Sequence, residues 1–198
     1  EKHGAAVVFA PRVEDLYPLP DNRVFDLDGL DYCGEGPRRP GHFNGVVQVV
    51  TRLFDIVKPA KAFFGEKDFQ QLAILRHMAA KLGYNIEIIG CPIVRDTDGL
   101  ARSSRNMLLS PAQRAAAPHI YATISKASEL MKTYTPREVI EQLVKEIDSN
   151  KELETEYIEL VDSTTLKIVK KWDDAEHIRL WCAVYARPVR LIDNIAVK

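Results

Sequence analysis

The sequence predicts an α/β protein in which a parallel sheet is followed by a small α+β domain with an antiparallel sheet. Two observations carry this prediction. Between residues 5 and 90, short apolar runs alternate with segments of helical periodicity, which is the element order of a parallel sheet. After residue 94, two segments of helical periodicity are followed by several segments in which apolar and polar residues alternate, as in strands. We therefore place the two domains at residues 1–93 and 94–198.

The first strand and helix follow from their apolar patterns. Residues 5–10 are a continuous apolar run of strand length, typical of a parallel strand that is covered on both faces. Residues 11–41 are rich in proline and glycine and are expected to form a long connection. Residues 43–57 then carry apolar side chains at helical spacing, and Pro59 follows the expected end of that helix.

A strand–turn–helix–strand unit completes the first domain. The pattern predicts a strand at residues 62–64, a turn at residues 65–67 and a helix at residues 69–82. Gly83 is expected to end this helix, because glycine readily takes the left-handed conformation. Residues 85–90 are predicted to be the next strand.

In the second domain, two proline-containing start signals predict two helices. Ser110-Pro111 and Thr135-Pro136 each place a capping side chain before a proline at the first helical position. We expect helices near residues 111–131 and 136–149. The alternating patterns that follow predict four strands, at residues 156–161, 165–170, 179–186 and 188–195.

Charge, cysteine content and hydropathy indicate a cytoplasmic protein without nucleic-acid or membrane partners. The formal net charge is −1, so the whole chain has no field that would attract nucleic acid or an anionic membrane. Cys33, Cys91 and Cys182 lie far apart, which fits a reducing compartment and no protein-bound metal. No apolar run approaches the roughly 20 residues that a membrane span needs.

The first candidate site is Gly65-Glu66-Lys67-Asp68 with Gln71 one helical turn later. It follows a predicted strand and opens a helix, where ligands of parallel sheets bind and where free N–H groups favour anions. Gly65 would let a backbone approach a ligand closely, and Lys67 would supply a mobile charge for phosphate oxygens. The alternative is an ordinary turn with a solvated lysine.

Two further segments offer anion-binding side chains. Ser103-Ser104-Arg105-Asn106 combines two hydroxyls with a planar guanidinium, which together can bind a phosphate chain. The alternative is a polar domain linker. Arg39 and His42 lie in a turn that could contact an anion, although we interpret it as a surface loop whose aromatic residue points inward.

Taken together, these motifs resemble the pantoate–β-alanine ligase family. FFGEKDFQQLAILRHMAAKLG followed by IEIIGCPIVRDTDGLARSSRNMLLSPAQR carries the resemblance. VFAPRVEDLYP, RPGHFNGVVQVVTRLFDIVKP and RLIDNI extend it over essentially the whole chain. The paired phrases GEKDxQQ and SSRN at this separation make chance similarity a poor explanation.

The resemblance implies a fold, a reaction and a set of partners. The fold would be Rossmann-like, as in HxGH nucleotidylyltransferases, with a C-terminal domain that closes over the site. The enzyme would bind ATP and pantoate, form pantoyl adenylate and pyrophosphate, and then let β-alanine displace AMP to give pantothenate. Family members use Mg²⁺ and are homodimers.

Carried over by position, the resemblance also implies roles for individual residues. Lys67, Ser103 and Arg105 would be catalytic, acting on the phosphates, and Gln71 would bind pantoate. The residues expected to bind ATP are Gly65, Lys67, Asp68, Pro92, Val94, Ser103, Ser104 and Arg105.

The sequence departs from the family in two respects. It contains no HxGH and opens directly in an apolar run, so we expect a fragment whose parallel sheet lacks its first unit and which is inactive or nearly so alone. Arg102 stands where the family is usually apolar, and would alter loop packing or add a phosphate contact. The competing interpretations are another nucleotidylyltransferase of the same fold, and a non-catalytic dimerising or nucleotide-binding half-domain.

Overall fold

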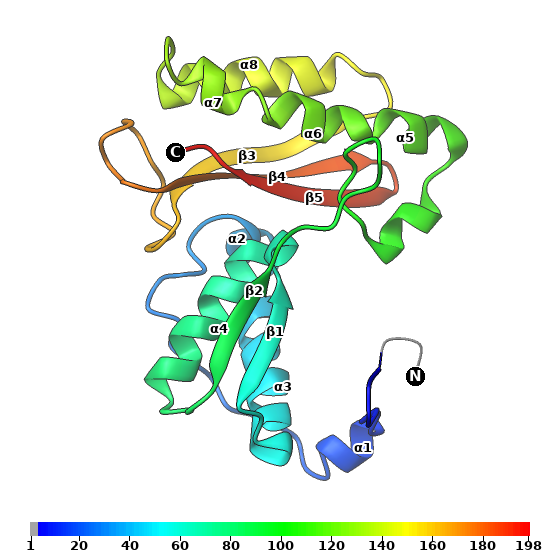
Figure 1. Cartoon of the computed structure of the whole chain (residues 1–198), viewed down its shortest axis with the longest axis vertical. Helices are drawn as coiled ribbons and strands as arrows, with labels where there is room; N and C mark the ends of the chain where they lie inside the picture. Colours follow the sequence, from blue (N-terminus) through cyan, green and yellow to red (C-terminus); the bar gives the residue numbers. More distant parts are fainter. Residues whose placement is uncertain (1–3) are drawn as a thin grey trace.

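Two sheets, one parallel and one antiparallel, lie in the two halves of the computed structural model, which describes residues 4–198 (Figure 1). In the first half, β1 (Lys61–Gly65) pairs in parallel with β2 (Glu87–Cys91). In the second half, β3 (Glu154–Asp162), β4 (Ile178–Ala186) and β5 (Val189–Ala196) form an antiparallel sheet in that order. The predicted fold class, a parallel α/β unit followed by an antiparallel α+β unit, is confirmed.

Two long helices pack beside the parallel strands. They are α3 (His42–Val57) and α4 (Phe69–Lys81), close to the predicted ranges. Their facing side chains are buried together with Leu27, because both helices carry apolar residues on one face. Gly83 follows α4 with φ +74°, the left-handed conformation expected at this helix end.

The second half has its sheet covered on both faces. Four helices pack over one face: α5 (Pro111–Ala116), α6 (Pro118–Ile124), α7 (Ala127–Leu130) and α8 (Pro136–Asp148). The other face meets the first half, where Trp181 packs against Phe69 of α4. The two halves therefore share an apolar contact beside the sheet. The division between residues 93 and 94 remains a prediction.

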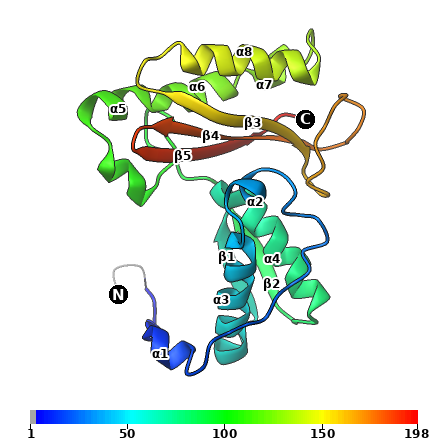
Figure 2. The ribbon, with the colours of Figure 1, turned by 180° about the vertical axis from the view of Figure 1, so that it is seen from behind.

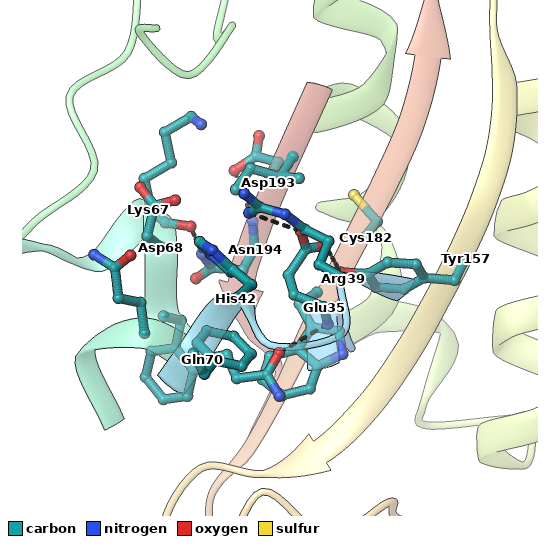
Figure 3. Close-up of a pocket in the computed structure, with 15 residues that line it drawn as sticks. Glu35, Arg39, His42, Lys67, Asp68, Gln70, Tyr157, Cys182, Asp193 and Asn194 are labelled. Carbon is teal, nitrogen blue, oxygen red and sulfur yellow. Dashed lines mark hydrogen bonds and ion pairs between the residues drawn. The ribbon is translucent and has the colours of Figure 1, made fainter. Parts of the chain in front are cut away.

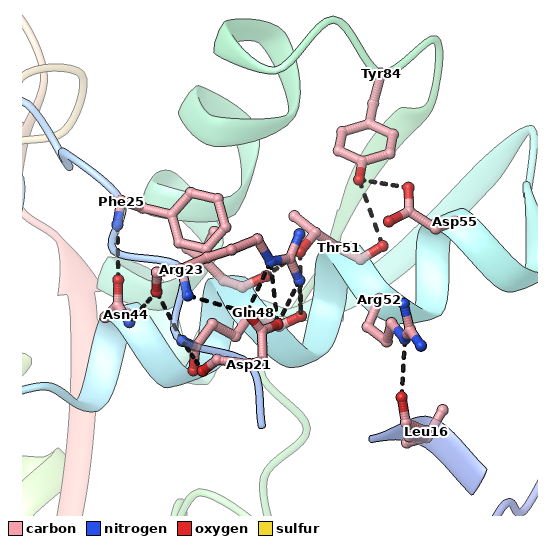
Figure 4. Close-up of polar contacts among 11 residues, drawn as sticks. Leu16, Asp21, Arg23, Phe25, Asn44, Gln48, Thr51, Arg52, Asp55 and Tyr84 are labelled. Atoms are coloured by element: carbon pink, nitrogen blue, oxygen red, sulfur yellow. Dashed lines mark hydrogen bonds and ion pairs between the residues drawn. The ribbon is translucent and has the colours of Figure 1, made fainter. Parts of the chain in front are cut away.

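The predicted long connection contains two short helices and otherwise runs along the surface of the first half. These helices are α1 (Val13–Leu16) and α2 (Glu35–Arg38), and the chain between them passes over α3 and α4 (Figure 2). Asn44 on α3 holds this chain by donating to the Arg23 carbonyl and accepting from the Phe25 amide (Figure 4). Further along, Lys81 on α4 holds the same segment by donating to the Asp26 carbonyl and to the Asp28 carboxylate.

The strand predicted at residues 5–10 is wrong. The structure gives these residues no strand pairing, and Val7 and Val8 are 83% and 76% exposed. A parallel strand needs a hydrogen-bonded neighbour and covered faces, and the described part of the chain supplies neither to this segment.

Two predictions in the second half also need correction. The segment 165–170 is a turn with a single bridge from Ile168 to Val161, because Leu166 takes a left-handed φ of +58° that no regular strand allows. The helix predicted over residues 111–131 is three short helices, since Pro118 lacks the N–H that would continue α5 and starts α6 instead.

No helix in residues 4–198 is long and apolar enough to span a membrane.

Candidate active site

A cleft lies where the start of α4 and the α2–α3 turn meet β4 and β5, on the sheet face that helices α5–α8 do not cover (Figure 1). Its cavity has a volume of about 40 Å³ and opens to solvent. Figure 3 shows Lys67 and Asp68 on one side, Arg39 and His42 in the middle, and Asp193 behind them. Charged side chains from both halves therefore line one cavity.

Lys67 is held at the end of β1 by a short 3₁₀ turn, Glu66–Asp68, that leads directly into α4. Burial removes water from its ammonium and lowers the pKa of Lys67; Arg105 adds to this, while Asp68 and Asp193 oppose it. Lys67 also lines a second, smaller cavity with Ser103 and Asp193. The lysine thus lies between two adjoining cavities.

The serine–arginine motif forms the 3₁₀ turn Ser104–Leu108, and Ser103 caps it. The Ser103 hydroxyl accepts the Arg105 N–H at 3.3 Å. Arg105 is exposed, and its charge lowers the pKa of both Lys67 and His42. Lys67 and Ser103 line the same small cavity, whereas Arg105 lines neither cavity. Ser104 instead lines an open surface hollow beside Arg102.

The other predicted site residues lie at different distances from the cleft. Asp68 and Gln71 line it. Gly65 is exposed, and a Cβ there would meet nothing within 4 Å, so the space over this backbone is open. Pro92 and Val94 are exposed and line neither cavity.

The α2–α3 turn is an exposed surface loop, as predicted. Phe43 points inward as expected and is 3% exposed. Arg39 and His42, however, line the cleft. Burial, helped by the charge of Arg39, lowers the pKa of His42.

A buried ionic network at one wall of the cleft was not predicted at all. Glu35 accepts the Tyr157 hydroxyl at 2.6 Å and two Arg190 bonds at 2.7 and 2.8 Å. Burial opposes ionisation of Glu35, yet these hydrogen bonds outweigh it and lower the pKa of Glu35. The network joins α2 to β3 and β5. Sequence patterns gave no signal for it, because Glu35 lies more than a hundred residues from both Tyr157 and Arg190.

Gln70 and Arg102, which flank the predicted site residues in the sequence, make contacts within the protein. Gln70 is buried and holds the chain before α3: its amide donates to the Leu30 and Cys33 carbonyls and accepts the Glu35 N–H. Gln70 and its neighbour Gln71 both line the cleft. Arg102 pairs with Asp96 at 2.8 Å, so it takes part in loop packing.

This geometry defines an α/β protein with a cleft between two halves that is lined by charged side chains of both signs, and comparison with known proteins specifies the family. A family profile described as "Pantoate-beta-alanine ligase" matches residues 1–196. The pantothenate synthetase of Bacteroides thetaiotaomicron is 48% identical over 198 residues, covering all of this chain and 70% of that protein. That of Phocaeicola vulgatus is 49% identical and is covered to 71%. The chain belongs to the pantoate–β-alanine ligase family and is an enzyme of that class.

Solved structures agree with this assignment. Pantothenate synthetase from Thermus thermophilus superposes with a TM-score of 0.89 at 38% identity, over 99% of this chain and 71% of that one. The pantoate–β-alanine ligase of Francisella tularensis, described as complexed with "Beta-gamma ATP and Beta-alanine", gives a TM-score of 0.68 at 30% identity, over 93% and 62% of the two chains.

Proposed function

We propose that the chain condenses pantoate with β-alanine through a pantoyl adenylate, using ATP and releasing pyrophosphate and then AMP. The observation that supports this most is the convergence of Lys67 and Ser103 on one cavity. The Francisella ligase, described as a complex with an ATP compound and β-alanine, supports ATP as a substrate.

In the first step, a pantoate carboxylate oxygen attacks the α-phosphorus and the bond to pyrophosphate breaks. Negative charge shifts onto the leaving pyrophosphate oxygens, where Lys67 and Arg105 stabilise it. The ammonium of Lys67 is already partly desolvated, so its attraction to phosphate is stronger than that of a surface lysine. No covalent enzyme intermediate is needed.

In the second step, the β-alanine amine attacks the acyl carbon and AMP leaves with the bonding electron pair. The amine loses a proton as the amide forms. Gln71 is proposed to hold pantoate in the cleft during both steps. Gly65, Asp68 and Ser104 are proposed to contact the nucleotide, and Pro92 and Val94 the adenine through their backbone beyond β2.

Mg²⁺ is proposed to enter with the nucleotide. Among residues 4–198, no three His, Cys, Asp or Glu side chains are grouped so that they could hold a metal ion. Mg²⁺ commonly binds through substrate phosphates, waters and one or two carboxylates, so such a protein cage is not required. When bound, the ion would neutralise phosphate charge. A homodimer is proposed on the family resemblance, and light scattering would test it.

A binding experiment tests the adenylate mechanism without depending on turnover. A sulfamoyl analogue of pantoyl adenylate mimics the intermediate, so calorimetry should show it binding at least about 100-fold more tightly than ATP. Another nucleotidylyltransferase would give no such gain. An analogue affinity no better than that of AMP would contradict the proposal.

Turnover of this chain is proposed to be slow, because the family resemblance assigns phosphate-binding histidines to an HxGH motif that these 198 residues lack. Exchange of labelled pyrophosphate into ATP should require pantoate but not β-alanine, at less than about 1 s⁻¹. Rapid exchange would show that the motif is dispensable. Exchange of phosphate into ATP would contradict the adenylate.

A further inference from the structure

Asn194 on β5 reaches across the cleft to the turn that carries Lys67. Its side chain is buried, and the residue is 1% exposed. The amide nitrogen donates to the Glu66 carbonyl at 2.9 Å and to the Lys67 carbonyl at 3.0 Å. One residue of the antiparallel sheet thus binds two successive carbonyls of the 3₁₀ turn Glu66–Asp68, which is called the lysine turn below.

The orientation of this amide is determined by Arg179 on β4. The Arg179 guanidinium donates to the Asn194 Oδ1 atom at 2.6 Å. Guanidinium groups only donate, so the oxygen must face Arg179 and the nitrogen must face the carbonyls. The same guanidinium lies 4.1 Å from the ring centre of Phe69, the first residue of α4. Both ends of the lysine turn are therefore in contact with the sheet.

The residue before Asn194 holds the serine–arginine loop. Asp193 accepts two hydrogen bonds from Arg95, at 2.6 and 2.9 Å, and a third from the Asn194 N–H at 2.8 Å. Arg95 lies on the segment leading to Ser103 and also donates to the Gly99 carbonyl at 3.1 Å. Two adjacent side chains of β5 therefore hold the two elements that converge on the cleft.

We propose that Asn194 is a positioning residue that sets where Lys67 stands relative to the Ser103–Arg105 loop. The inference rests on the proposed contact of Lys67 with the ATP phosphates. Displacement of a charged group by about 1 Å is enough to cost about 100-fold in a reaction that depends on its placement. A clamp on the backbone of Lys67 leaves its ammonium free for the ligand.

A double-mutant cycle in ATP affinity separates positioning from a purely structural role. The variants are Asn194→Asp, Lys67→Met and the combination, compared with the wild-type chain by calorimetry. Asn194→Asp keeps an acceptor for Arg179 but removes both donors to the lysine turn. Asn194→Ser removes the amide without adding charge, and it carries the same test if the aspartate variant does not fold.

Asn44→Asp is the matched control. Asn44 also holds a backbone carbonyl through its amide, but it does so on the surface of α3, outside the cleft. The Asn44→Asp variant should bind ATP with the same affinity as the wild-type chain.

The proposal predicts that Asn194→Asp and Lys67→Met each weaken ATP binding about tenfold, and that the double variant binds no more than about twofold more weakly than Lys67→Met alone. Losses that multiply would overturn the positioning role and leave the proposed function standing. If Lys67→Met binds ATP as the wild type does, the phosphate role of Lys67 fails, and the proposed function and this inference fail with it.

Discussion

The ammonium group of Lys67 is partly buried in the absence of a ligand, so it has already lost part of its hydration. Burial lowers the pKa of Lys67, and a phosphate chain would favour its charged form again. Local sequence was enough to single out Lys67, Ser103 and Gln71, which line the two cavities, because each belongs to a turn or helix start with its own pattern. It could not find Asn194, whose partner at Lys67 is 127 residues away.

Two arginines of one loop provide a residue-scale prediction. Arg105→Ala should weaken ATP binding about tenfold, since it removes a charge-assisted contact to phosphate. Arg102→Ala should leave the affinity within about twofold, because Arg102 is engaged by Asp96 on the exposed side of the loop. Calorimetric titration of both variants measures this. Equal effects of the two substitutions would contradict the assignment of Arg105 to the phosphates.

At the scale of elements, the sequence was reliable where the signal was local. Ser110 and Thr135 each form the reciprocal capping box that their sequences predict. It failed where an element depended on distant partners or on backbone conformation. The apolar run 5–10 has no neighbouring strand, and the alternation at 165–170 gave no sign of the left-handed Leu166.

The cap of α8 gives the element-scale prediction. The Thr135 hydroxyl accepts the Glu138 N–H, and Glu138 in turn accepts from the Thr135 backbone at 2.8 Å. Thr135→Ala should lower the free energy of unfolding by about 1 kcal/mol, measured by urea denaturation. Thr164→Ala, at an exposed turn residue, is the control and should lower it by less than about 0.5 kcal/mol. An unchanged midpoint for Thr135→Ala would contradict the stabilising role of this cap.

For the whole molecule, the decisive feature is that the cleft is built from both halves. Glu35 ties α2 to Tyr157 and Arg190 of the antiparallel sheet, and Asn194 ties that sheet to the lysine turn. The sequence predicted the two halves and the motifs that meet. It did not predict the contacts between the halves, which depend on how the two sheets pack.

The Glu35 network predicts a specific pH dependence of stability. The pKa of Glu35 in the folded state lies below its ordinary value of 4.5. The stabilising contribution of Glu35 is therefore complete above pH 4.5 and is lost as the pH falls through the folded-state pKa. Glu35→Gln should lower the free energy of unfolding by about 3 kcal/mol near neutral pH, because Arg190 loses a buried partner.

Urea denaturation of wild type and Glu35→Gln, from about pH 7 to about pH 3, measures this dependence. The difference between the two proteins should shrink as the solution becomes acidic. A difference that stays constant over this range would mean that ionised Glu35 does not stabilise the fold.

The most direct measurement is a crystal structure of this chain with a non-hydrolysable ATP analogue and pantoate. The account predicts the triphosphate within hydrogen-bonding distance of both the Lys67 ammonium and the Ser103–Arg105 loop, with the pantoate carboxylate facing the α-phosphorus. A nucleotide bound elsewhere, or phosphates that contact only one of these two elements, would contradict it.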